Sequence, residues 1–102
     1  MNKYVTKRLF QGFICLHILH HASIEPVYGN WLIEELAEHG YKLSPGTLYP
    51  ILHSLEKEAL LKSFEETVGG KIRKNYEITN EGRLELEGAK AYLSELVKEI
   101  KL

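Results

Sequence analysis

The histidines are the residues of this chain whose type and spacing could support metal chemistry. His17 and His21 lie four residues apart in a segment of helical character, and His20 lies beside them. Two histidines at i and i+4 share one helix face, where both imidazoles can bind one metal ion. A site needs one or two further ligands, from a partner subunit or from Cys15, which points elsewhere on the helix. Hydrogen-bonded histidines at a helix end and subunit interface are the favoured interpretation, so we expect no bound metal and no cofactor.

The sequence holds no constellation of catalytic groups. It contains no Asp and no Gly-rich phosphate-binding loop, and its one cysteine, Cys15, lies in an apolar run. Ser44 is better explained as a helix cap than as a nucleophile. A single cysteine excludes an internal disulfide and fits a reducing compartment. We therefore expect a cytoplasmic protein that is not an enzyme.

The stretch LSPGTLYPILHSLEKEALL (residues 43–61) predicts a helix with a marked start. Ser44 can cap this helix, and Pro45 suits its first position because the missing N–H would be unpaired there anyway. Leucines recur along one face at helical spacing. The other face carries short polar or aromatic side chains and no acid, namely Thr47, Tyr49, Pro50, His53 and Ser54. Such a helix suits a DNA groove.

Pro50 conflicts with a helix that starts at Ser44. In the second turn it would delete one backbone hydrogen bond, whereas with Thr47 as the cap it would fall in the first turn and cost nothing. We expect either a turn-like lead over residues 44–46 or a slight kink at Pro50.

The segments around this stretch predict a winged helix-turn-helix. A helix over about residues 30–39 ends at Gly40, and a short turn joins it to the helix of residues 44–58. After Leu61 the pattern changes to that of a hairpin, with Gly69-Gly70 as its turn. Lys71, Arg73 and Lys74 add three positive charges beside that turn. A charged hairpin is more often a solvated face, but after two such helices it indicates a wing (residues 69–74) that contacts phosphates or the minor groove.

Both terminal segments predict helices suited to dimerisation. The helix over residues 4 to about 22 is apolar nearly all round, which indicates burial on more than one side. A last helix begins at Asn80, a cap candidate, and its apolar residues follow the spacing of paired helices. The residues expected at the dimer interface are Phe10, Phe13, Leu86, Ala89, Leu93, Leu96 and Ile100.

Length and charge set limits on the architecture. With 102 residues and 44% hydrophobic residues, the chain can form one small core. We expect a mainly α fold with a two-stranded β wing, divided into a DNA-binding domain (residues 1–79) and a dimerisation helix (residues 80–102). The net charge of −1 confines any DNA surface to a local basic patch. The longest apolar run, residues 9–19, is too short and broken to span a bilayer, and no signal peptide is evident.

Three segments together resemble the PadR-like transcriptional regulators: YGxxLIEEL, then GYxLSPGTLYPILHSLEKExLL, then GGKIRKNYEITNEGRxLE. The resemblance covers about residues 9–90, and SPGTLYP (residues 44–50) is its most specific part. It implies a dimeric winged-helix repressor that binds a palindromic operator in double-stranded DNA, in the compact branch of the family with a single C-terminal helix. The residues that match its DNA-binding regions are Ser44, Thr47, Tyr49, Pro50, His53, Lys71, Arg73 and Lys74.

Two positions depart from the family pattern. Asn30 follows Gly29 where an aromatic is usual, and the aromatic comes one residue later as Trp31; Ala59 stands where Gly is usual before the first wing strand. Some family members respond to aromatic compounds, so Trp31 and Tyr92 could stack on a small aromatic effector, although core or interface roles are commoner for aromatics. The alternatives to a repressor are a winged-helix protein-interaction module and a metal-responsive regulator using His17, His20 and His21.

Overall fold

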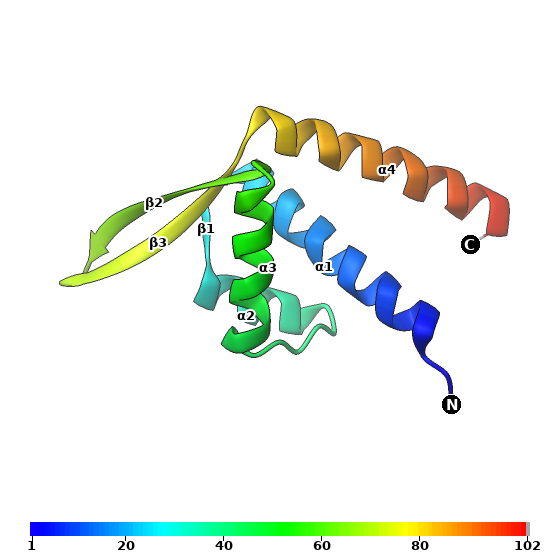
Figure 1. The fold of residues 1–102 in the computed structure, drawn as a ribbon, viewed down its shortest axis with the longest axis horizontal. Coiled ribbons are helices and arrows are strands. Elements are labelled where there is room, and N and C mark those ends of the chain that lie inside the picture. Colours follow the sequence, from blue (N-terminus) through cyan, green and yellow to red (C-terminus); the bar gives the residue numbers. More distant parts are fainter. Residues whose placement is uncertain (102) are drawn as a thin grey trace.

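The computed structural model describes residues 1–101 as helices packed around a small antiparallel sheet (Figure 1). The elements, in chain order, are α1 (Tyr4–Ile24), β1 (Val27–Tyr28), α2 (Gly29–Glu38), α3 (Pro45–Lys57), β2 (Leu61–Val68), β3 (Lys71–Ile78) and α4 (Asn80–Ile100). The helices α2 and α3 form a helix-turn-helix, and the hairpin β2–β3 follows as a wing. The predicted mainly α, winged-helix fold is confirmed. The division into domains at residue 80 stays a prediction, and residue 102 lies outside the described residues.

The core lies where α1, α2 and α3 meet. Four leucines of the helix-turn-helix have no exposed surface: Leu32, Leu36, Leu48 and Leu52. Ile18 of α1 is equally buried and belongs to the same cluster. Burying side chains of this size stabilises a fold by about 1.5–3 kcal/mol each. This packing fixes which face of α3 points inward, and it turns the polar face outward.

The sheet contains a strand that the sequence did not indicate. Its order is β1-β3-β2, and both pairings are antiparallel. In the segment between the helices predicted over residues 4 to about 22 and about 30–39, Val27 pairs with Tyr76 and Tyr28 with Asn75. Two residues are too few to show a period, so only the contact with β3 identifies β1. The sheet therefore has three strands, and β1 anchors the wing to the start of α2.

The wing itself has the predicted turn. Val68 pairs with Lys71 across a two-residue loop, in which Gly69 and Gly70 have φ of +57° and +78°. Positive φ at both central residues is typical of the type I′ turn, and glycine adopts it without steric cost.

The start of α4 is bonded to the end of α3. Asn80 was expected to cap α4, but the capping residue is Thr79, whose Oγ1 accepts a hydrogen bond from the Gly82 N–H at 2.9 Å. The same hydroxyl donates to the Ala59 carbonyl at 2.6 Å. Gly82 packs so closely on the Leu60 carbonyl that a Cβ there would overlap the oxygen. Thr79 rather than Asn80 caps the helix, and its hydroxyl is the one that also bonds to the distant Ala59 carbonyl.

The first turn of α3 settles the question raised by Pro50. The helix begins at Pro45, with Ser44 as the N-cap residue by backbone geometry, but the Ser44 side chain accepts no capping hydrogen bond. Its carbonyl accepts the N–H groups of Thr47 and Leu48, each at 3.0 Å. Pro50 therefore lies inside the helix, in its second turn, and neither Ser44 nor Thr47 uses its hydroxyl as a cap.

The helices α1 and α4 extend away from the wing on the same side of the molecule (Figure 1). Their apolar residues are only partly covered: Phe10 is 36% exposed, Leu93 36%, Leu96 48% and Ile100 56%. Leu86 is buried at 7%, so it belongs mainly to the core of the subunit. Within residues 1–101, no helix combines the length and apolar character needed to cross a membrane.

Ala59 adopts a left-handed conformation, with φ of +62°. An L-residue with a Cβ is strained there by about 1–2 kcal/mol, and glycine is not. Ala59→Gly is therefore expected to raise the free energy of unfolding by about 0.5–1 kcal/mol, after allowance for the greater entropy of glycine in the unfolded chain. Urea unfolding followed by circular dichroism, at one fixed protein concentration, measures the change.

The matched control for this substitution is Ala37→Gly, at an exposed position inside α2. It should lower the stability by about 0.5–1 kcal/mol, because glycine is a poor helix former. Equal or lower stability of Ala59→Gly relative to the parent would show that the left-handed turn carries no strain.

Candidate nucleic-acid interface

The outer face of α3 is exposed along its whole first half. Its side chains at the surface are Ser44, Thr47, Tyr49, Pro50 and His53. The inner face is anchored by buried leucines, so these side chains cannot turn inward. The first turn of α3 contains no acidic residue. Hydroxyl groups at a helix N-terminus, where the partial charge is positive, can bind phosphate oxygens.

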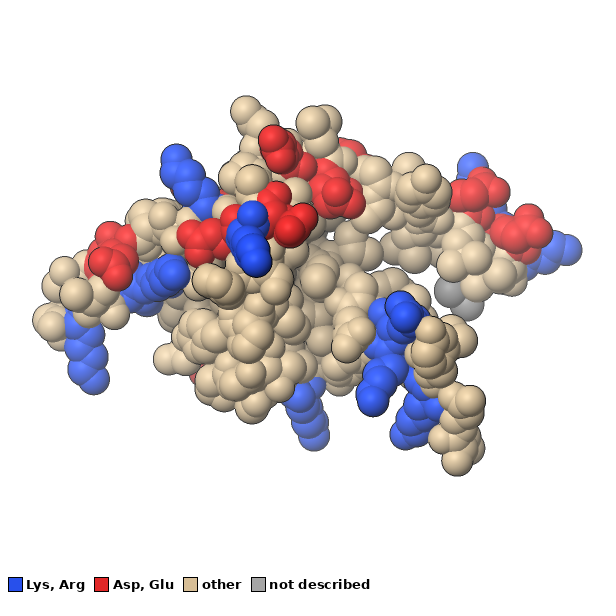
Figure 2. All heavy atoms as spheres, viewed as in Figure 1, with Lys and Arg blue, Asp and Glu red and all other residues tan. Residues whose placement is uncertain are grey.

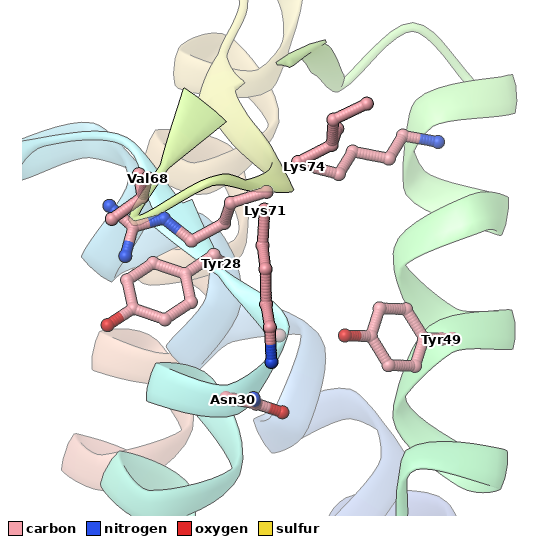
Figure 3. A pocket seen from close by; sticks show the side chains of 9 residues that line it. Tyr28, Asn30, Tyr49, Val68, Lys71 and Lys74 are labelled. Carbon is pink, nitrogen blue, oxygen red and sulfur yellow. The ribbon is translucent and has the colours of Figure 1, made fainter. Parts of the chain in front are cut away.

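A hollow of about 350 Å³ separates the start of α3 from the wing (Figure 3). Tyr28 and Asn30 line one side, Tyr49 lines another, and the β3 end of the hairpin covers the rest. Lys71 reaches down between the two tyrosine rings, with its ammonium group toward Asn30 (Figure 3). The wing and the exposed face of α3 therefore open onto the same surface.

The side chain of Tyr49 lies directly on the backbone of Gly29. This contact packs α3 against the start of α2. A Cβ at Gly29 would stand 2.5 Å from Cζ of Tyr49 and overlap its hydroxyl. Only glycine permits this approach, which explains why Gly29 follows Tyr28 at this point. The ring of Tyr49 is held in place by this contact although it is 43% exposed.

Arg73 is engaged within the subunit. Its guanidinium lies 4.0 Å from the ring centroid of Tyr28, and its Nη2 donates to Oε1 of Glu66 at 3.0 Å. Asn75, which is 3% exposed, donates to the same carboxylate oxygen at 2.8 Å. These two hydrogen bonds hold the pKa of Glu66 below its ordinary value. Arg73 therefore braces the wing against β1, and only part of its charge faces outward.

Lys74 is also partly compensated, whereas Lys71 is not. The Nζ of Lys74 lies 3.7 Å from Oε1 of Glu56. Glu56 also accepts a hydrogen bond from Ser63, and that bond, followed by Lys74, lowers its pKa. Lys71 pairs with no acidic residue in the described part of the chain. Among the three wing cations, Lys71 is thus the best placed to bind a phosphate.

The charged side chains are unevenly distributed over the face drawn in Figure 2. Glu side chains, with some Lys or Arg among them, gather over the strands and along α4, whereas the lower edge carries mainly Lys and Arg at the wing, below α2 and α3, and at the start of α1. The start of α3 lies at this lower edge (Figure 1). A protein with a net charge of −1 therefore still presents a locally basic face.

The structure changes the membership of the histidine cluster. His17 and His21 face His39, and the candidate ligand atoms of these three lie within 4.8 Å of one another. His20 is exposed and outside that group. Burial is the main cause that lowers the pKa of both His17 and His21. Sequence reasoning assigned no role to His39, because its neighbours come from another helix, although Glu35 and His39 also stand at i and i+4.

The two aromatics considered for an effector are not brought together within the subunit. Trp31 packs against the core and lines a small hollow with Pro26 and Val27. Tyr92 is 83% exposed on α4 and lines a different hollow. An aromatic effector that stacks on both Trp31 and Tyr92 stays a prediction, because within one subunit these side chains line separate hollows. Tyr28 and Asn30, which sequence reasoning left out of the DNA-binding set, do line the hollow beside Lys71.

Comparison with known proteins identifies the family and agrees with the fold. Residues 18–88 match the model of the "Transcriptional regulator PadR-like family". The chain is 49% identical over 85 residues to Transcriptional regulator Rv3488 of Mycobacterium tuberculosis, which covers 83% of this chain and 79% of the relative.

Solved structures give the same result. A PadR family regulator from Eggerthella lenta superimposes with a TM-score of 0.83 at 32% identity, covering 97% of this chain and 88% of that one. A PadR-like regulator from Bacillus cereus has a TM-score of 0.83 at 31% identity, covering 92% and 93%. The chain therefore belongs to the PadR-like family and is a DNA-binding transcriptional regulator.

Proposed function

We propose that the start of α3 and the wing form one DNA-binding surface. The observation that carries this proposal is the position of Lys71, whose side chain lines the same hollow as Tyr49 of α3. In this arrangement α3 enters the major groove and the wing contacts the adjacent backbone or minor groove. The residues assigned to the surface are Ser44, Thr47, Tyr49, Pro50, His53, Lys71, Arg73 and Lys74.

These side chains differ in what they contribute. The hydroxyls of Ser44 and Thr47, at the start of the helix, position the protein on phosphates. Thr47, in the first turn of α3, can also contact a base edge. His53 lies two turns further along and can donate to or accept from a base edge. Lys71 binds phosphate directly, whereas Arg73 acts mainly by holding the wing on Tyr28.

We also propose that the protein acts as a homodimer through α1 and α4. The partly exposed apolar residues of both helices support this proposal, since a small domain gains stability by covering them. The residues assigned to the interface are Phe10, Phe13, Ala89, Leu93, Leu96 and Ile100, whereas Leu86, also predicted there, lies in the core of the subunit. Twofold symmetry then places two copies of α3 on half-sites roughly 34 Å apart, or a multiple of that, in a palindromic operator. A dimer bound over a promoter represses transcription.

Replacing Lys71 with Ala tests the wing. The variant should bind operator DNA several-fold more weakly, and the slope of log K against log salt should fall by about 0.9 for each lost phosphate contact, thus about 1.8 per dimer. Fluorescence anisotropy over a salt series measures both quantities. The single substitution is preferable to a triple one, because removing Arg73 also removes the contacts to Tyr28 and Glu66.

The control is Lys98→Ala, which removes an exposed lysine from α4 and should leave the affinity and the slope unchanged. If Lys71→Ala behaves like this control, the wing does not contact the DNA backbone.

The dimer is tested by Leu93→Glu combined with Leu96→Glu. A carboxylate placed in an apolar interface would lose its hydration without gaining a partner, so the protein should become monomeric. Size-exclusion chromatography with light scattering gives the mass. Glu95→Lys, which changes a charge on the opposite side of α4, should leave the dimer intact. A parent protein that is already monomeric, or an unchanged mass for the double variant, contradicts the proposed interface.

Sequencing the genomic fragments that the purified protein retains tests the function as a whole. We expect a palindromic sequence to be enriched upstream of a small number of genes. Without enrichment of any sequence, a winged-helix module that binds another protein would be the better description.

A further inference from the structure

Two helices each present a pair of metal-binding side chains to the same space. His17 and His21 lie one turn apart on α1, and Glu35 and His39 lie one turn apart at the end of α2. The ring centroids of His17 and His39 are 5.0 Å apart, and those of His17 and His21 are 6.1 Å apart. One candidate ligand atom from each of the three histidines lies within 4.8 Å of the others. Pairs at i and i+4 on two facing helices can surround one ion.

Glu35 completes this group from the side of α2. Its Oε1 lies 3.4 Å from Nε2 of His39 and 3.7 Å from Nε2 of His21. In a tetrahedral zinc site with bonds of 2.0–2.1 Å, neighbouring ligand atoms are about 3.3–3.4 Å apart. The pair of Glu35 and His39 therefore already has the spacing of two ligands, and the pair of Glu35 and His21 comes close to it.

His21 supplies an independent observation. Its Nε2 is buried and finds no hydrogen-bond partner in the described part of the chain, and it is directed toward Glu35. An unpartnered buried polar atom is rare and needs an explanation. A metal ion between His21 and Glu35 would provide the missing partner.

We propose that His17, His21, His39 and Glu35 bind one divalent transition-metal ion of the zinc type. Imidazole nitrogens suit Zn²⁺, Co²⁺, Ni²⁺ and Cu²⁺, whereas Ca²⁺ and Mg²⁺ prefer sets of oxygen ligands. The adjustment needed to close the site is small. The side chain of His39 is 47% exposed and stands at the end of α2, so it can rotate toward the other ligands without disturbing the core.

His20 serves as the matched control. It is next to His21 in the sequence, and its ring lies 5.1 Å from that of His21 at a steep angle, but it is exposed and outside the ligand group. A protein that binds zinc only through scattered surface histidines would lose affinity equally on replacement of His20 or His39. The proposed site predicts a difference between them.

The experiment uses the full chain without any affinity tag, stripped of metal with a chelator that is then removed. Titration with Zn²⁺ in competition with a chromophoric chelator should show one ion bound per chain. His39→Ala should weaken binding by more than about tenfold, since loss of even a supporting group costs that much. His20→Ala should leave the affinity unchanged. Urea unfolding of the metal-free variants checks that each one is folded.

Two further measurements test the ligand set. Co²⁺ in place of Zn²⁺ should give the intense visible absorption of four-coordinate cobalt, and His17→Ala should abolish it. Glu35→Gln should weaken Zn²⁺ binding, because an amide is a poorer ligand than a carboxylate, and unchanged affinity removes Glu35 from the set. Binding below one ion per chain, or equal losses for His20→Ala and His39→Ala, would overturn the site.

Discussion

The junction between α3, the wing and α4 is the constraint on which the arrangement of the whole molecule depends. Ala59 reverses the chain in a left-handed turn, and the carbonyls of Ala59 and Leu60 then bond to Thr79, which arrives from the far end of the wing. Gly82 packs on the same Leu60 carbonyl. One small set of backbone groups thus fixes where α3 ends, where the wing departs and in which direction α4 leaves. The orientation of α3 relative to the wing and to α4 is set there.

The three cations of the wing, which are one run of charge in the sequence, have two roles in the structure: two of them make contacts within the subunit, and one is unpaired within residues 1–101. Arg73 is occupied by Tyr28 and Glu66, and Lys74 lies near Glu56. Ion pairs between partly exposed groups contribute little stability, so these contacts act mainly by holding a two-stranded ribbon in one orientation. A rigid wing loses less entropy when it meets DNA. The remaining lysine, Lys71, then carries most of the unpaired charge at the tip.

Periodicity and turn chemistry were enough to predict the helices, the hairpin turn and the winged-helix fold. They failed where a feature depends on a contact between distant segments. The strand β1 is too short to have a pattern, and only its pairing with Tyr76 defines it. Thr79 and Asn80 are both of residue types that commonly cap helices, but Thr79 is the cap, and it also bonds to the distant Ala59 carbonyl. His39 joins His17 through the packing of α2 on α1, and no local spacing in the sequence reveals that.

The helix α1 is apolar on nearly every side because it contacts several parts of the molecule. Ile14 and Ile18 face the core, with 2% and 0% exposure. His17 and His21 face His39 at the end of α2, while Phe10, 36% exposed, packs against the ring of Tyr41 and leaves part of its surface open. A helix shared in this way transmits a change at one surface to the others only as a rigid body, because its core face cannot move without opening a cavity. An ion bound at the proposed site between α1 and α2 would therefore act on the angle between these helices, and so on how α2 and α3 pack against α1.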